Sequence, residues 1–148
     1  MAAVAALTPA VVPRYDSPKH HRPSHCVTNV RILLDQARRT LLDAEYAARP
    51  LDRYAQADRA ALRAAAAVLA ARARPRNRAR PTSAWALLAT LGPDFAEWSR
   101  LFAATSATRA AAEAGARHLV TERDADNLVR RAGEFLTFAA HAVARSSR

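Results

Sequence analysis

Apolar residues recur at intervals of three and four along most of the chain, and no stretch alternates in the way that a strand would. This pattern predicts an all-α fold, an up-and-down helical bundle of four long helices and one short helix, in residues 28–146. The first long helix begins at Thr28, and Pro50 ends it. Its predicted inward positions are Val30, Leu33, Leu34, Ala37, Leu41, Ala44 and Ala48.

The second predicted helix covers about residues 51–74 and has a long alanine-rich stretch with high helix propensity. Because alanine side chains are small, they allow neighbouring helices to approach closely. The predicted inward positions of this helix are Tyr54, Ala55, Ala61, Leu62, Ala65, Val68 and Leu69.

Capping residues predict the ends of the remaining helices. Ser83 caps a short helix that Gly92 ends, and Pro93 opens the next long helix. Thr121 and Asp124 have the spacing of a capping box for the last helix. The predicted inward positions of these three helices are Trp85, Leu87, Leu88 and Leu91; Phe95, Trp98, Leu101, Phe102 and Thr105; and Leu128, Val129, Ala132, Phe135, Leu136, Ala139 and Val143.

Residues 1–27 have a different composition, with four prolines and three histidines. Prolines at this density break a helical period, so we expect a disordered Pro/His-containing tail. Residues 1–7 are apolar but lack the basic region of a secretory signal. No apolar run is long enough to span a membrane, and a single cysteine implies no oxidising compartment. We therefore expect a cytoplasmic protein with no membrane contact.

The chain contains 39 alanines, and its net charge is +10 because 23 basic residues face 13 acidic ones. Most arginines lie near acids, and three i,i+4 pairs are predicted on helix surfaces: Arg31–Asp35, Glu45–Arg49 and Asp126–Arg130. A predicted loop over residues 72–82 differs, because it contains five arginines and no acid: Arg72, Arg74, Arg76, Arg78 and Arg80.

The Arg/Pro loop at 72–82 is the leading candidate for a binding site. Guanidinium groups pair with phosphate oxygens, and their spacing in this extended, proline-bracketed segment resembles that of phosphates. Trp85 follows closely and either stacks on a base or belongs to the core. The alternative interpretation is a solubilising loop in a chain whose composition favours Ala, Arg and Pro.

Catalytic and metal sites have weaker support. His20, His21, His25 and Cys26 lie close together, but no second cysteine or helical ligand completes a zinc set, so neither a metal nor a cofactor is predicted. His118 follows Arg117 in the turn before the last helix, and such a pair can serve in RNA cleavage. The alternative for His118 is an ordinary helix-end residue, and His141 fits a surface position.

Several segments together resemble HEPN-domain proteins, in particular an actinobacterial subfamily. These segments are L-L-D-Q-A-R-R-T-L-L, A-A-L-R-A-A-A-A-V-L-A-A-R-A-R-P, S-A-W-A-L-L, D-F-A-E-W-S-R-L-F-A-A and D-A-D-N-L-V-R-R-A-G-E-F-L. The resemblance implies an all-α bundle that is frequently a homodimer and that binds RNA or nucleotides. It also implies a possible nucleotidyltransferase partner, since many members are ribonucleases of toxin–antitoxin systems.

The ribonuclease motif of such proteins is absent from the helical region. Catalytic members carry an Arg, four to six residues and then a His, and neither His118 nor His141 has an Arg at that distance. Arg14 precedes His20 and His21 at the distance that the motif requires, but all three residues lie in the tail. In a chain with this many arginines, chance explains such a spacing. We therefore expect a non-catalytic HEPN-like module that binds RNA or nucleotide phosphates through the loop. The alternatives are a HEPN ribonuclease that uses Arg117 and His118, and a protein-interaction or dimerisation module.

Overall fold

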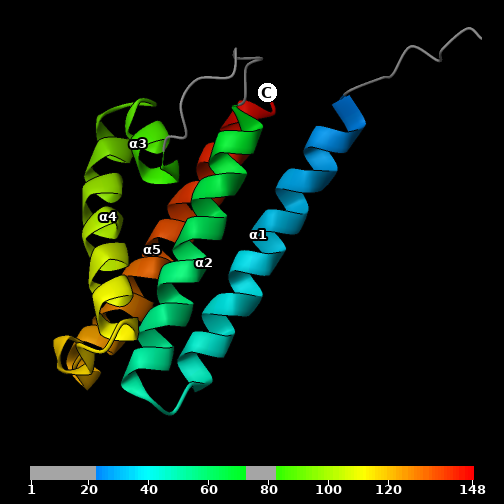
Figure 1. Cartoon of the computed structure of the whole chain (residues 1–148). Coiled ribbons are helices and arrows are strands. Elements are labelled where there is room, and N and C mark those ends of the chain that lie inside the picture. The colour runs from blue at the N-terminus through cyan, green and yellow to red at the C-terminus, as the bar shows by residue number, and fades with distance from the viewer. Residues whose placement is uncertain (1–22, 73–82) are drawn as a thin grey trace, which may run out of the picture.

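The computed structural model describes residues 23–72 and 83–148, and within these ranges all regular structure is helical. Four long helices and one short one form the bundle (Figure 1), which confirms the predicted fold class. The long helices are α1 (Pro23–Tyr46), α2 (Pro50–Ala71), α4 (Pro93–Glu113) and α5 (Glu122–Ser146), the short helix is α3 (Ala84–Ala89), and a 3₁₀ turn, η1, covers Arg117–Leu119.

Helix α2 occupies the centre of the arrangement. It packs against α1 through their shared hairpin and against α5, and it also contacts α3 and α4. Figure 1 shows α1 at one edge of the bundle and α4 with α3 at the opposite edge. The end of α5 lies at the same end of the bundle as the end of α2, because the two helices run side by side.

The start of α1 differs from the prediction. The helix begins at Pro23, so residues 23–27, which were assigned to the tail, are helical. The fixed φ of proline suits the first turn of a helix, where its missing N–H is not needed. Residues 1–22 lie outside the described residues, and the disordered tail remains a prediction for them.

Alanine dominates the buried face of α2. Its side chains let the helices of the α1–α2 hairpin approach closely, since interaxial distance depends on the side chains at the contact. Seven alanines of this helix are buried, and α1 contributes a buried Ala37 and Ala44 to the core. The seven are Ala55, Ala57, Ala60, Ala61, Ala64, Ala65 and Ala67.

Aromatic side chains fill the other half of the core, between α3, α4 and α5. The ring of Trp85 stacks on Phe102 with centroids 5.1 Å apart, and Phe102 lies 5.2 Å from Phe135. Trp98 and Phe138 extend this cluster towards the surface. The short helix α3 thus inserts one large ring between the two long helices that follow it.

Two of the predicted helix starts are confirmed in atomic detail. The Ser83 hydroxyl accepts a hydrogen bond from the Ala86 amide at 3.1 Å, at the start of α3. At α5, the Asp124 amide donates to the Thr121 hydroxyl at 3.1 Å, while the Thr121 amide donates to the Asp124 carboxylate at 3.0 Å. This reciprocal pair is the capping box that the spacing predicted.

Two predicted inward positions are wrong. Leu62 is 39% exposed on the outer side of α2, because the alanine-rich face next to it makes the buried contacts. Ala48 is exposed in the turn after α1, which ends at Tyr46. Helix α2 also ends at Ala71, three residues before the predicted end. None of the described helices carries an apolar stretch of the length that crossing a bilayer requires.

Candidate functional site

Arg72, the first arginine of the loop, is held in place by the bundle. It is the C-cap of α2, and its Nε donates a hydrogen bond to the Ser146 hydroxyl at 3.2 Å. Its guanidinium carbon lies 5.1 Å from the centroid of the Phe95 ring, a cation–π contact. Arg72 therefore joins the end of α2 to the start of α4 and the end of α5.

The remaining candidate arginines, Arg74, Arg76, Arg78 and Arg80, lie in residues 73–82, outside the described residues. Their proposed binding role stays a prediction. The structure does describe where this segment leaves and re-enters the bundle. It leaves after Arg72 and returns at Ser83, the cap of α3.

Two further arginines lie close to the base of the segment. Arg145 and Arg148 are exposed at the end of α5, one and two residues from the Ser146 that Arg72 contacts. The sequence alone did not predict these two arginines as binding residues, because they come close to Arg72 only through the packing of α5 beside α2. Arginines from two distant parts of the chain are thus gathered at one end of the bundle.

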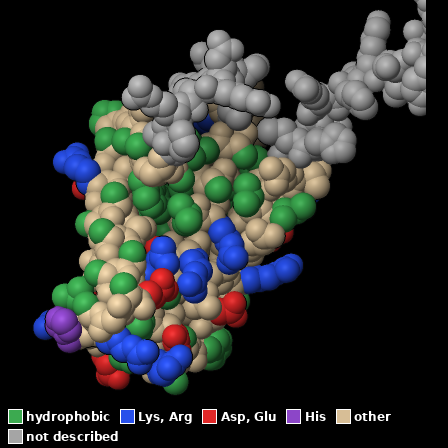
Figure 2. Space-filling model, viewed as in Figure 1, with side chains coloured by type: hydrophobic (Ala, Val, Ile, Leu, Met, Phe, Trp, Pro, Cys, Tyr) green, Lys and Arg blue, Asp and Glu red, His purple; other side chains and the backbone are tan. Residues whose placement is uncertain are grey.

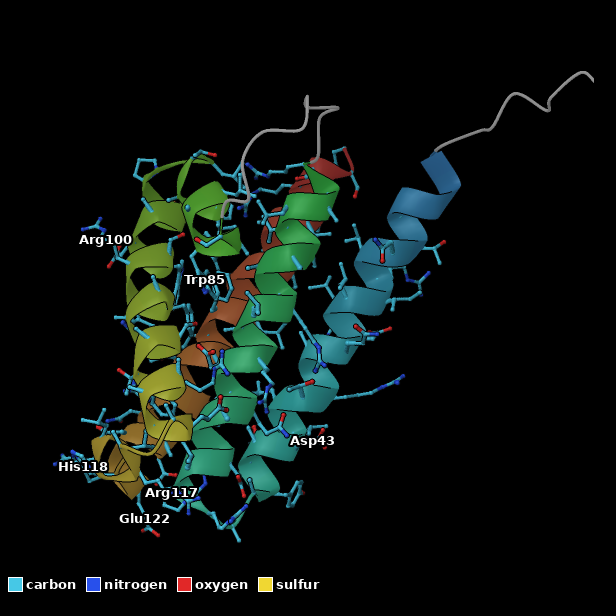
Figure 3. The ribbon with its side chains drawn as sticks, viewed as in Figure 1. Asp43, Trp85, Arg100, Arg117, His118 and Glu122 are labelled. Carbon is cyan, nitrogen blue, oxygen red and sulfur yellow. The ribbon has the colours of Figure 1, made fainter. Side chains whose placement is uncertain are left out.

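Trp85 does not offer its ring to a ligand. It is 6% exposed, and its contacts with Phe102 and Phe135 place it in the core. Figure 3 shows its side chain between the helices rather than at the surface. Of the two interpretations of Trp85, base stacking and core packing, the structure selects core packing.

The rest of the described surface carries mixed charge. Residues 28–72 and 83–148 contain 16 basic and 12 acidic residues. On the face shown in Figure 2, basic and acidic side chains lie next to one another across the middle of the bundle. The excess of positive charge therefore comes mainly from the segment after Arg72 and from the N-terminal residues.

The predicted i,i+4 ion pairs are not the ones that form. Asp35 pairs with Arg38 at 2.9 Å, and Asp126 pairs with Arg53 of α2 at 2.5 Å. Asp35 thus pairs with an arginine three residues away, and Asp126 pairs with an arginine of a neighbouring helix, instead of the predicted partners. Glu45–Arg49 is likewise replaced, because Arg49 pairs with Asp52.

A buried carboxylate forms a polar cluster that sequence reasoning missed. Asp58 of α2 is 1% exposed and accepts hydrogen bonds from three side chains of α4, at 2.8 to 3.2 Å: Thr105, Ser106 and Arg109. Arg109 also pairs with Glu113 at 3.0 Å. Because every oxygen of Asp58 has a donor, the cluster joins α2 to α4 and leaves no reactive group free. The sequence does contain one indication of this cluster: Asp58 is an acid among the alanines of the inward face of α2.

The Arg117–His118 pair lies at the opposite end of the bundle, in η1. Both residues are exposed, and Figure 3 shows His118 on the outer side of the molecule. Among the described residues, no hydrogen-bond partner orients the imidazole of His118. The structure therefore leaves the sequence-based alternatives for His118, an RNA-cleaving residue and an ordinary helix-end residue, as they stood.

Among the residues that the structure describes, two side chains have shifted pKa values for clear physical reasons. Burial raises the pKa of Tyr54 above its ordinary value of 10.0, and a hydrogen bond with Thr108 partly offsets this. Hydrogen bonds from the backbone amide and hydroxyl of Thr121 lower the pKa of Asp124 below its ordinary 3.8. Both groups serve the fold, one in the core and one in a helix cap.

The described residues contain no group of three or more His, Cys, Asp or Glu side chains placed to hold a metal ion. The candidate cluster of His20, His21, His25 and Cys26 precedes the residues whose side chains are described. That the chain binds no metal therefore stays a prediction.

The fold and the sequence pattern together define a HEPN-type helical bundle. The chain belongs to the SAV_6107-like HEPN family, whose model matches residues 44–140, more than half of its length. This family of the HEPN superfamily is named after a Streptomyces protein. Comparisons with curated proteins and with solved structures found no match.

Proposed function

We propose that this HEPN domain is a non-catalytic, cytoplasmic module that binds the phosphate groups of RNA or nucleotides. The site comprises Arg72, which lies at the end of the bundle where α2 and α5 finish, together with Arg74, Arg76, Arg78 and Arg80 of the segment that follows it. Neutralising phosphates releases condensed counterions, which favours binding at low salt.

The observation that carries the proposal is the docking of Arg72 against the end of α5. The hydrogen bond to Ser146 places Arg72, the first arginine of the acid-free segment, at the same end of the bundle as Arg145 and Arg148. Elsewhere on the described bundle, several arginines form ion pairs with acids that offset their charge, among them Arg49, Arg59 and Arg130. The gathering of Arg72, Arg145 and Arg148 at this end supports a phosphate site there, although Asp94 and Glu97 lie nearby at the start of α4.

The non-catalytic part of the proposal is supported by the histidines. His118 and His141 are exposed, and neither follows an Arg at the spacing of HEPN ribonucleases. Incubating labelled RNA with the purified chain tests this. Cleavage that disappears in a His118→Ala variant would overturn the non-catalytic assignment and establish the ribonuclease alternative.

Fluorescence anisotropy with labelled single-stranded RNA, across a salt series, tests the binding site. Replacing Arg74, Arg76, Arg78 and Arg80 by Gln should weaken binding. It should also reduce the slope of log K against log salt by roughly 0.7 for each phosphate that the variant no longer neutralises. Unchanged binding would refute the loop site.

The matched control removes the same charge from the exposed surface of α4, η1 and α5. Its four substitutions are Arg100→Gln, Arg117→Gln, Arg123→Gln and Arg130→Gln. We expect this variant to retain most of the affinity. An equal reduction in both variants would mean that net charge alone, and no particular end of the bundle, determines binding.

A further inference from the structure

Helix α1 has a second patterned face, opposite the one that packs on the bundle. Its inward side buries Val30, Leu34, Ala37 and Ala44. On the outward side, residues spaced by 3, 4, 3 and 4 form a row that we term the outer row. All of its members are exposed: Ile32, Asp35, Arg39, Leu42 and Tyr46.

Nothing in the described part of the chain covers the outer row. Helix α1 lies at the edge of the bundle in Figure 1, where its packing partners are α2 and α5 on its inner side. Ile32 is 48% exposed, Leu42 52% and Tyr46 86%, and Ile32 is the only isoleucine in the chain. Three large apolar side chains on one exposed row make this face a candidate contact surface.

The 3,4 spacing is that of the seam of a two-helix coiled coil, in which alternate a and d positions meet a partner helix. We propose that the outer row binds the outer row of a second copy of this chain, with the two α1 helices antiparallel. The contact is a two-fold symmetric dimer interface, independent of the proposed phosphate site at the end of α2.

The order of residues fixes the register. When the two-fold axis passes at the level of Ala37, Ile32 lies opposite Leu42 of the second copy. Asp35 then lies opposite Arg39 of that copy, and symmetry repeats each pair. An antiparallel coiled coil pairs a with d positions in each layer, which this register satisfies. The dimer therefore has two apolar layers that enclose two ion pairs.

Charge complementarity selects this orientation. In a parallel arrangement, Asp35 would face Asp35 and Arg39 would face Arg39, and like charges at facing positions are destabilising. Arg39 has no ion pair among the described residues, whereas Asp35 pairs only with the exposed Arg38 of its own helix. The antiparallel dimer supplies Arg39 with the carboxylate that it lacks in the single chain.

The extent of the row sets the strength of the contact. Residues 32–46 span about 21 Å at 1.5 Å per residue, which is short for a permanent interface. We therefore expect a dimer whose population rises with protein concentration. Most of the row also precedes residues 44–140, the segment that the HEPN family model matches.

Sedimentation equilibrium of the full chain tests the proposal. The wild type should approach the dimer mass as concentration rises. Arg39→Asp places four acids at the centre of the seam and should give a monomer at the same concentrations. The double variant with Asp35→Arg and Arg39→Asp restores opposite charges across the seam and should restore the dimer.

Arg100→Asp is the matched control, since Arg100 lies on α4, away from α1 (Figure 3), and should leave the mass unchanged. Circular dichroism should show equal helicity in all variants, because the changed residues are exposed. A wild-type monomer at every concentration, or a dimer that Arg39→Asp does not dissociate, would overturn the proposal. So would a double variant that stays monomeric.

Spin labels distinguish the orientation. In a Cys26→Ser background, a nitroxide at a Tyr46→Cys position should lie roughly 27 Å along the helix axis from its copy in the antiparallel register. Parallel helices would bring the two labels opposite each other. A short distance in electron double resonance would therefore refute the antiparallel interface, and a distance near the expected value would support it.

Discussion

Arg109 Nε lies 2.8 Å from the Oδ2 atom of Asp58, and this ion pair connects α4 to α2 through a carboxylate that is 1% exposed. Thr105 and Ser106 donate to the same carboxylate from successive positions of α4. A buried charge that is paired and fully hydrogen-bonded holds its partners in one arrangement. The pair thus sets which face of α4 meets α2.

Removing this carboxylate should strongly destabilise the fold. Asp58→Ala removes the acceptor of Arg109 Nε and of the Ser106 hydroxyl, while Arg109 keeps its pair with Glu113 and Thr105 keeps its hydrogen bond to the Phe102 carbonyl. We therefore expect a loss of about 2–3 kcal/mol. Urea denaturation measures the change in the free energy of unfolding. The control is Asp43→Ala on the exposed surface of α1, for which we expect less than about 0.5 kcal/mol. Equal destabilisation of the two variants would contradict a special role for Asp58.

Arg72 should contribute to stability as well as to charge. Arg72→Gln removes the cation–π contact with Phe95 and weakens the contact with Ser146, for an expected destabilisation of about 1–2 kcal/mol. Thermal unfolding of Arg72→Gln, Phe95→Leu and the double variant measures the coupling between the two side chains. Arg148→Gln, near the same end but without a described partner, should leave the melting temperature unchanged. Additive effects at Arg72 and Phe95 would exclude the contact.

Substitutions of Trp85 should reduce the stability of the fold and leave the affinity for RNA unchanged. Trp85→Ala empties a core position between Phe102 and Phe135, and such truncations cost about 3–5 kcal/mol. Trp85→Phe keeps a ring in the stack and should retain wild-type RNA affinity in the anisotropy assay. A fall in affinity for a folded Trp85→Phe protein would show that the indole contacts the ligand.

The capping box should give α5 a pH-dependent stability in the acid range. The pKa of Asp124 is lowered in the folded chain, so its contribution is complete above 3.8 and is lost as the pH falls through the lower, folded value. Wild type should therefore exceed Asp124→Asn in stability at pH 7, and the difference should shrink below about pH 4.

Thr121→Ala removes the other half of the box and should cost about 1 kcal/mol at neutral pH. The measurement for both variants is urea denaturation at a series of pH values. A difference between wild type and Asp124→Asn that stays constant from pH 7 to acid would contradict the assignment.

The sequence predicted the elements that depend on local chemistry. Ser83, Pro93 and Thr121 mark helix starts because capping and proline geometry act within one turn. The inward face of α5 was also predictable, since its apolar residues stand out against polar neighbours.

What the sequence could not predict depends on distant partners. Leu62 lies between alanines on several sides, so periodicity does not distinguish its exposed position from a buried one. Arg145 lies near Arg72 only because α5 ends beside α2. The role of Asp58 likewise depends on Thr105 and Ser106, which come from a distant part of the chain. The partners of surface arginines are equally unpredictable, because several acids lie within reach of each.

The alanine-packed hairpin of α1 and α2 restricts how this chain can vary. At a buried alanine of α2 every replacement except glycine adds volume, and overpacking costs about 1–3 kcal/mol, while glycine costs about 1 kcal/mol in helix propensity. In a leucine-rich core, a change at one position can be balanced by the opposite change at another. Ala61 and Ala64 are completely buried and alanine has no smaller helix-forming substitute, so a mutation that enlarges either residue has to displace the side chains or the helix packed against it.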